Sequence, residues 1–171
     1  MFTLATFHLW TQEKSMNKPV IINSPCGSGK STMIEVFASY MVRRYPNTFG
    51  CVIVKDKLSQ VEETVASVNR SVGKEVAYGL KGFNPKIISK IEYQEQFKEQ
   101  LVFPILVITQ AMLSRKANSG TLEEIAYFYN EESFKQRRTQ LLIDEKPHLV
   151  STFTFNEKTL HDLFLDIKKV T

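Results

Sequence analysis

Short apolar runs alternate with longer amphipathic segments along this chain of 171 residues. A run that is apolar at consecutive positions is typical of a strand that is buried on both faces of a sheet. Glycine, proline and asparagine residues separate many of these runs from the segments that follow. The pattern predicts strands at residues 20–23, 51–54, 75–78, 104–108 and 140–143, the last of them in the interior of the sheet.

The longer segments carry apolar residues at the spacing of an α-helix. Pro46 ends the first of these segments and Gly73 closes the second. Strands that alternate with helices predict an α/β fold, in which helices cover both faces of a mostly parallel sheet. The length suits a single domain over residues 1–171. Helices are predicted at 32–45, 58–72, 88–98, from 111 to 115 and at 157–168, with helical or irregular connections at 122–128 and 133–138.

A glycine-rich segment at residues 24–32 joins the first predicted strand to the first predicted helix, which is the context of a phosphate-binding loop. Gly27 and Gly29 remove the Cβ atoms that would keep the backbone away from a polyphosphate. Lys30 would place its charge between the β- and γ-phosphates, and the hydroxyl of Ser31 would coordinate Mg²⁺. The predicted nucleotide contacts are Pro25, Cys26, Gly27, Ser28, Gly29, Lys30, Ser31 and Thr32.

This loop departs from the strict motif at its first position, where Ser24 replaces glycine. The alternative interpretation is a turn rich in glycine and serine, with Ser31 or Thr32 as the N-cap of an ordinary helix. The strand before and the helix after the loop favour the phosphate-binding interpretation.

Two carboxylates follow the last predicted strand. Asp144 stands at the carboxyl end of that strand, where α/β sheets place ligand-binding groups, and would hold Mg²⁺ through an oxygen ligand. Glu145 would orient and deprotonate the water that attacks the γ-phosphate. The alternative is an exposed acidic pair next to Lys146. Together with the loop, these residues predict ATP and Mg²⁺ as cofactors, with Lys30 and Glu145 as catalytic residues and with Ser31 and Asp144 as metal ligands.

Charge and cysteine content add little to this picture. A net charge of +4 and a pI near 9.0 permit an anionic partner such as nucleic acid. The pair Arg137 and Arg138 is expected on a solvated helix face. Two cysteines without paired spacing suit a reducing, cytoplasmic setting, and no segment approaches membrane-spanning length.

The two motifs together resemble those of the superfamily 2 helicases and translocases of the DEAD/DEAH type. Residues 24–31 are similar to motif I, and Asp144 to Pro147 occupy the place of the DExx box. Residues 54–60 resemble motif Ia, and residues 108–113 resemble the threonine-containing motif. By this resemblance Lys55, Lys57 and Thr109 contact the nucleic-acid backbone. The alternative is that these residues lie in exposed loops, with Thr109 as a helix N-cap.

The resemblance implies a RecA-like P-loop NTPase fold and the first, ATP-binding domain of a helicase motor. Its implied partners are nucleic acid, DNA or RNA, and a second RecA-like domain in cis or in trans. Because 171 residues leave no room for the second domain, the chain is expected to bind nucleotide with at most very slow hydrolysis. An ABC-type ATPase, a nucleotide kinase and a non-catalytic nucleotide-binding module remain alternatives on the motifs alone.

Overall fold

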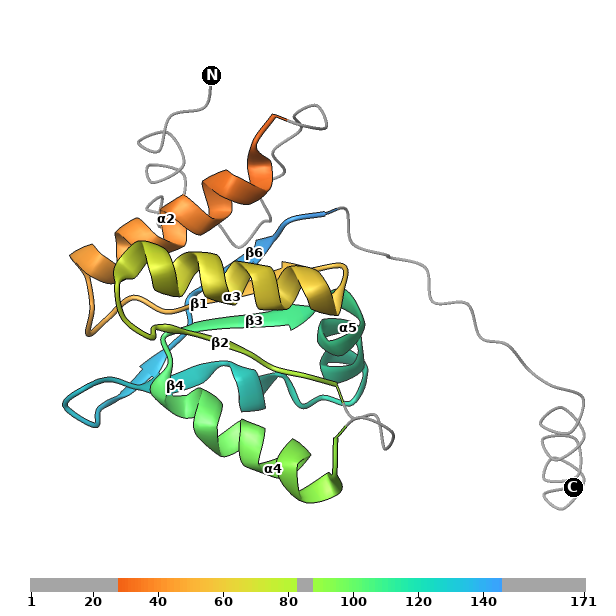
Figure 1. The fold of residues 1–171 in the computed structure, drawn as a ribbon. Coiled ribbons are helices and arrows are strands. Elements are labelled where there is room, and N and C mark those ends of the chain that lie inside the picture. Colours follow the sequence, from red (N-terminus) through yellow and green to blue (C-terminus); the bar gives the residue numbers. More distant parts are fainter. Residues whose placement is uncertain (1–27, 83–87, 146–171) are drawn as a thin grey trace, which may run out of the picture.

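The computed structural model describes residues 28–82 and 88–145, and its centre is a parallel sheet of four strands (Figure 1). In spatial order the strands are β2 (Ala77–Gly79), β3 (Ile105–Thr109), β1 (Cys51–Lys55) and β6 (Gln140–Ile143). Every neighbouring pair runs in the same direction. The strand predicted at 20–23 and the helix predicted at 157–168 lie outside the described residues.

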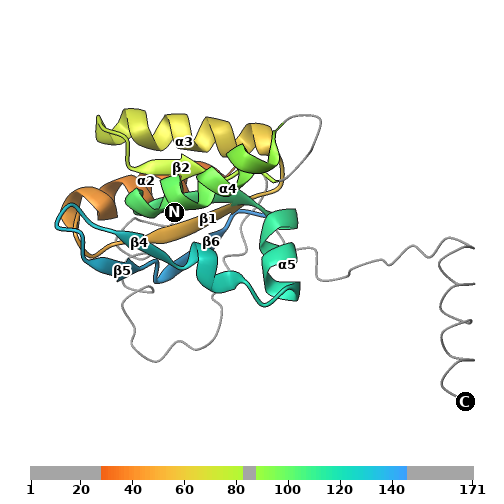
Figure 2. The same cartoon turned by 90° about the horizontal axis from the view of Figure 1, so that it is seen from below.

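Helices cover both faces of this sheet (Figures 1 and 2). Helices α2 (Lys30–Arg44) and α3 (Leu58–Val72) pack on one face. Helix α5 (Gln110–Asn118) and the 3-10 turn η2 (Leu122–Ile125) pack on the other. Helix α4 (Lys90–Glu99) lies beside β2 and continues into the 3-10 turn η1 (Gln100–Val102). The predicted α/β architecture is therefore confirmed.

The two central strands, β1 and β3, each contribute side chains to two separate hydrophobic cores, one on each face of the sheet. In β1, Cys51 and Ile53 pack under α2 and α3, whereas Val52 and Val54 pack against the opposite cluster. Strand β3 divides its residues in the same way. Because successive side chains of a strand point to opposite faces, a strand covered on both sides has no polar face. This explains why both strands are apolar up to their last residues, Lys55 and Thr109.

The connection from α3 to β2 is held by the side chain of Asn69. Its Oδ1 accepts hydrogen bonds from the amides of Val76 and Ala77 at 2.9 and 2.8 Å, and its Nδ2 donates to the carbonyl oxygen of Ala77 at 3.2 Å. Gly73 ends α3 at a φ of 82°, as its place in the sequence predicts. The strand begins two residues later than predicted, because the preceding amides bond to Asn69.

Residues 122–138 differ from the prediction, since they form an antiparallel hairpin after η2. Among the described strands, β4 (Tyr127–Tyr129) and β5 (Lys135–Arg137) pair only with each other. The turn between them depends on Asn130, whose Oδ1 accepts hydrogen bonds from the amides of Glu132 and Phe134 at 3.1 and 2.9 Å. Ser133 adopts a φ of 61° in this turn. The sequence predicted helical or irregular connections here; η2 is helical, whereas the strands after it were not predicted, because the asparagine side chain organises a turn between them.

Arg138, which was predicted to be solvated, is buried with 6% of its surface exposed. Burial lowers the pKa of its guanidinium to about 10. Its two terminal nitrogens donate four hydrogen bonds to backbone carbonyl groups, which tie the hairpin to η1 and η2. The acceptors are the carbonyl oxygens of Ile125 and Tyr127, at 2.9 and 2.5 Å, and of Gln100 and Phe103, both at 2.7 Å.

Strand β6 has the predicted bounds, and it stands at one edge among the described strands. Leu142 packs into the core under α2 and α3, while Leu141 on the opposite face is 52% exposed. Its one neighbour among the described strands is β1, so the residue after β6 lies beside the end of the most buried of these strands. None of the helices in the described part of the chain is both long and apolar enough to span a bilayer.

Candidate active site

The carboxyl ends of β1, β3 and β6 meet at one edge of the sheet, because the three strands are parallel. Lys55 ends β1 and stands in register with Thr109, which ends β3. The amide of Asp144, directly after β6, donates a hydrogen bond to the carbonyl oxygen of Val54 at 3.1 Å. The fold thus brings three segments that carry predicted site residues to a common edge.

Helix α2 begins with the residues predicted to bind phosphate. Gly29 is its N-cap at φ 81° and ψ 21°, a left-handed conformation that costs about 1–2 kcal/mol in other residues. No side chain in the described part of the chain caps this end, and the first turn contains no acidic residue. Ser31 and Thr32 lie inside the helix and are exposed, so neither is the N-cap that the alternative required. Pro25, Cys26 and Gly27 lie outside the described residues.

Backbone amides in the first turn of a helix have no partner within the helix, and they carry the positive end of its dipole. At α2 the first intrahelical hydrogen bond runs from Met33 to the carbonyl oxygen of Gly29, at 2.9 Å. Lys30 is half-buried at the start of this turn, and Ser28 is exposed just before it. This arrangement suits an anion with several oxygen atoms.

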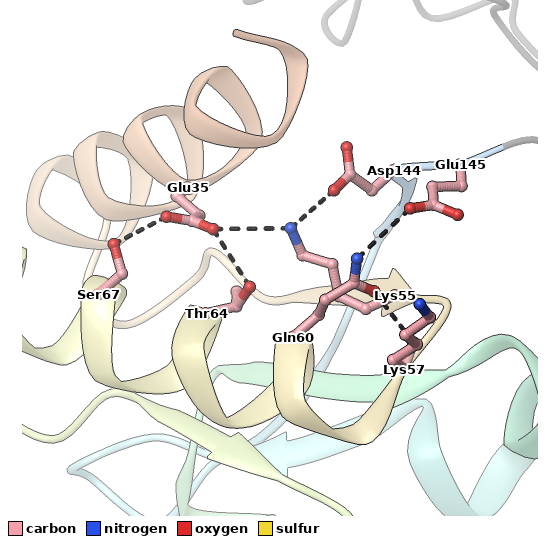
Figure 3. A network of polar contacts seen from close by, with 8 residues as sticks. All are labelled: Glu35, Lys55, Lys57, Gln60, Thr64, Ser67, Asp144 and Glu145. Carbon is pink, nitrogen blue, oxygen red and sulfur yellow. Dashed lines mark hydrogen bonds and ion pairs between the residues drawn. The ribbon is translucent and has the colours of Figure 1, made fainter. Parts of the chain in front are cut away.

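Lys55 lies at the centre of a buried group of charges (Figure 3). Its Nζ is 2.7 Å from Oδ2 of Asp144 and 3.6 Å from Oε1 of Glu35. The side chains of Lys55 and Asp144 are only 4% and 5% exposed. Lys55 was predicted to contact nucleic acid, yet its ammonium group points toward the acidic motif and is shielded from solvent.

Glu35 connects this group to both helices on that face of the sheet. Its Oε1 accepts a hydrogen bond from Oγ1 of Thr64 at 3.1 Å, and its Oε2 accepts one from Oγ of Ser67 at 2.7 Å (Figure 3). Glu35 belongs to α2, whereas Thr64 and Ser67 belong to α3. A carboxylate therefore bridges the two helices beside the ammonium of Lys55.

None of these three polar residues was singled out from the sequence, although two signals were present. Glu35 is the one acidic residue in the sequence of α2. Thr64 falls within the apolar stripe of α3, between Val61 and Val68, and is 1% exposed. A polar side chain in a buried stripe needs a hydrogen-bond partner, so its position indicated a buried polar contact.

Ser31 and Glu35 are four residues apart in α2 and lie on the same side of the helix. Since Glu35 reaches Lys55, and Lys55 contacts Asp144, the same side of α2 faces the end of β6. The two predicted metal ligands, Ser31 and Asp144, therefore come from elements that are joined by this chain of charged residues.

Glu145 is exposed and contacts the start of α3. Nε2 of Gln60 is 3.4 Å from its Oε1, and Oε1 of Gln60 accepts a hydrogen bond from the amide of Lys57 at 3.0 Å (Figure 3). Lys57 is exposed as the N-cap of α3. Sequence reasoning did not identify Gln60, which contacts both a predicted catalytic residue and a predicted nucleic-acid contact.

Thr109 is the N-cap of α5, since its Oγ1 accepts a hydrogen bond from the amide of Met112 at 3.3 Å. The capping alternative is therefore observed for this residue, and a contact with nucleic acid stays a prediction. Its hydroxyl hydrogen can still donate a bond outward.

Among the described residues, Asp144 and Glu145 have no further acidic or metal-binding neighbours of the kind that encloses an ion. Within residues 28–82 and 88–145, no cluster of three histidine, cysteine, aspartate or glutamate side chains could hold a metal ion. Mg²⁺ commonly binds through one or two protein oxygens, with water and substrate phosphates as the remaining ligands. A hydroxyl and a single carboxylate are a donor set of that kind.

A model of a known protein family matches nearly the whole chain. The family described as "Type III restriction enzyme, res subunit" matches residues 4–166. No curated protein sequence gives a significant match. The parallel sheet agrees with the family match, and the family match separates the chain from ABC-type ATPases and nucleotide kinases. The chain belongs to the family of type III restriction enzyme res subunits and is an N-terminal, RecA-like, ATP-binding motor domain of superfamily 2.

Proposed function

We propose that this domain is the ATP-binding half of a nucleic-acid-dependent motor. It binds Mg·ATP through the loop at 24–32 and presents nucleic-acid contacts on the adjoining loops of the same sheet edge. Helicase-type domains of this kind generally use ATP and Mg²⁺ and work with nucleic acid and a second domain. The second RecA-like domain is supplied in cis or in trans.

The observation that supports this proposal most strongly is the chain of contacts from α2 to the acidic motif. Glu35, one turn after the predicted phosphate-binding residues, reaches Asp144 through the ammonium of Lys55. This chain of contacts supports the proposal that two motifs separated by more than a hundred residues in the sequence form one site. An ordinary capping turn at α2 gives no reason for a buried charge network that leads to the end of β6.

Within this proposal Ser31 and Asp144 hold Mg²⁺, which neutralises phosphate charge when it is bound. Lys30 binds the phosphates, and the first turn of α2 adds backbone donors. Glu145 is the general base, because it is exposed to water directly after Asp144. Rapid hydrolysis requires a positive group from the second domain to stabilise the transferring phosphoryl group, so this domain alone turns over very slowly.

Lys57 and the start of α5 at Thr109 form the proposed nucleic-acid surface. Both lie after strands that end at the active-site edge, and Lys57 is exposed. Contacts of a lysine and a helix N-terminus with phosphates are independent of base sequence. Lys55 is left out of this surface, because its ammonium is buried against Asp144.

Nucleotide binding tests the first part of the proposal. Calorimetry with ADP and Mg²⁺ should detect binding to the 171-residue chain, and Lys30→Ala should abolish it. Glu145→Gln should keep the affinity, since the glutamate acts in hydrolysis. Lys98→Ala serves as the control, because Lys98 is exposed in the last turn of α4, before the amino end of β3. Equal affinity of the Lys30→Ala variant and the wild type would remove that lysine from the phosphate site.

Anisotropy of labelled single-stranded oligonucleotides tests the second part. Lys57→Ala should weaken binding and reduce the slope of log affinity against log salt by about 0.7, the contribution of one phosphate contact. Lys98→Ala should leave the slope unchanged. Identical slopes for the two variants would exclude Lys57 from the surface, and a wild-type protein that binds neither DNA nor RNA would exclude the surface as a whole.

A further inference from the structure

We propose that Lys55 is a positioning residue for the metal site: its ammonium holds the carboxylate of Asp144 in the orientation that receives Mg²⁺. This inference rests on the proposed function. It assigns Lys55 a task within the nucleotide site, in place of a contact with nucleic acid.

The geometry leaves Asp144 able to serve two cations. Its Oδ2 lies 2.7 Å from Nζ of Lys55. An ionised carboxylate offers two oxygens with about four lone-pair sites, so Oδ1 remains available as a ligand of a metal ion or as an acceptor of a hydrogen bond from a metal-bound water. Contact through one oxygen fixes the rotation of the carboxylate, and this determines where the other oxygen points. The ammonium and the metal ion therefore act on different atoms of the same side chain.

Lys55 is itself held in place from several directions. It ends β1, the strand that lies between β3 and β6, and its side chain is 4% exposed. The backbone of Asp144 is bonded to Val54, the residue before Lys55. Oε1 of Glu35 lies 3.6 Å from the ammonium on the side of α2. A lysine confined in this way can orient a neighbour, whereas a lysine on a mobile surface loop cannot.

Glu35 can help to hold the Lys55 ammonium because its own carboxylate is fixed by hydrogen bonds from α3. Thr64 and Ser67 each donate a hydrogen bond to one of its carboxylate oxygens. The ammonium therefore lies between one carboxylate that is anchored to α3 and one that ends β6. Outer residues that orient a metal ligand in this manner contribute about tenfold to a hundredfold to metal affinity.

The test compares ADP affinity in the presence of Mg²⁺ and in EDTA, by calorimetry on the full chain. The variants are Lys55→Met, which removes the charge and keeps a long side chain, Lys55→Arg, which keeps the charge, and Glu35→Gln. Lys74→Met is the matched control, because Lys74 forms an exposed ion pair with Glu131 at 3.0 Å. Mn²⁺ binding to the ADP complex, followed by electron paramagnetic resonance, provides a direct measure of the metal ion.

The expected result is a loss of metal affinity without a loss of metal-free nucleotide affinity. Lys55→Met should weaken Mn²⁺ binding by about tenfold or more and leave ADP affinity in EDTA unchanged. Lys55→Arg should recover most of the loss. Glu35→Gln should cause a smaller loss, since Gln keeps acceptor capacity for α3 but loses the charge beside the ammonium. Lys74→Met should match the wild type.

Four results would overturn the inference. Unchanged Mn²⁺ affinity in folded Lys55→Met would show that Asp144 needs no support, and tighter binding would show that the ammonium competes with the metal ion. If Lys55→Met does not fold, unchanged Mn²⁺ affinity in Glu35→Gln would equally contradict the inference. A wild-type chain that binds ADP equally in Mg²⁺ and in EDTA would instead overturn the proposed metal site, and the inference with it.

Discussion

Replacement of Arg138 by methionine should destabilise the domain strongly, although the residue lies outside the proposed active site. Methionine keeps an unbranched stem but removes all four hydrogen bonds to carbonyl groups of η1, η2 and β4. These carbonyl oxygens lose their donors in a region where Arg138 itself is only 6% exposed. A buried acceptor without a donor costs free energy that an exposed one does not.

The loss of folding free energy can be worked out from the number of hydrogen bonds that the substitution removes. At about 1 kcal/mol net for each hydrogen bond, four bonds give about 4 kcal/mol. The gain from no longer burying a guanidinium, whose pKa is lowered by desolvation, reduces this sum to about 3 kcal/mol. For a chain of this length each kcal/mol changes Tm by about 2–4 °C, so the expected decrease is about 6–12 °C.

Urea denaturation followed by circular dichroism, with thermal melts alongside, measures this loss. Arg137→Met is the matched control, because Arg137 is the exposed neighbour and its ion pair with Glu123 spans 3.9 Å; its effect should stay within about 0.5 kcal/mol. Arg138→Lys should recover only part of the loss, since one ammonium cannot reach carbonyl groups on two sides. Equal stabilities of Arg138→Met and Arg137→Met would refute the reasoning.

Two further predictions concern the core. Asn69→Ala should cost about 2–3 kcal/mol in urea denaturation, since three hydrogen bonds from α3 to the start of β2 are lost; a loss below about 0.5 kcal/mol would show that this connection needs no clamp. Burial raises the pKa of the Cys51 thiol from 9.0 to about 12, so iodoacetamide should modify the Cys51 peptide in denaturant and leave it unmodified in the native protein. Because the thiol ionises at lower pH in the unfolded chain than in the folded one, the contribution of the buried Cys51 to stability is complete below pH 9 and is lost as the pH rises toward 12. An equally steep loss of stability with pH in Cys51→Ala would contradict this.

The central strands could be predicted from the sequence because their own residues determine them. β1 and β3 are apolar at every position that enters the two cores, so a local pattern was sufficient. The bounds of β6 and the end of α3 at Gly73 also follow from neighbouring residues. The hairpin of β4 and β5 could not be predicted in this way, since two strands of three residues that pair with each other outside the main sheet depend on a turn such as that of Asn130.

In the candidate site, too, local sequence patterns predict individual residues but not the contacts between distant segments. That a lysine and an aspartate end two strands is visible in the sequence, and a phosphate-binding loop can be identified from its spacing. The contact between Lys55 and Asp144 depends on β6 lying next to β1, which joins residues 89 positions apart. Strand order is a property of the whole chain, so the direction of the Lys55 ammonium could not be predicted locally.

Helix α3 is connected to both carboxylates of the acidic motif, to Glu145 by a direct contact and to Asp144 through Glu35 and Lys55. Gln60 contacts Glu145 directly, and Thr64 and Ser67 hold the Glu35 carboxylate beside the Lys55 ammonium that binds Asp144. Any partner that shifts α3 would therefore change both carboxylates together. Such coupling is reciprocal: a ligand at the start of α3 that strengthens nucleotide binding must itself be bound more tightly, by the same factor, when nucleotide is present.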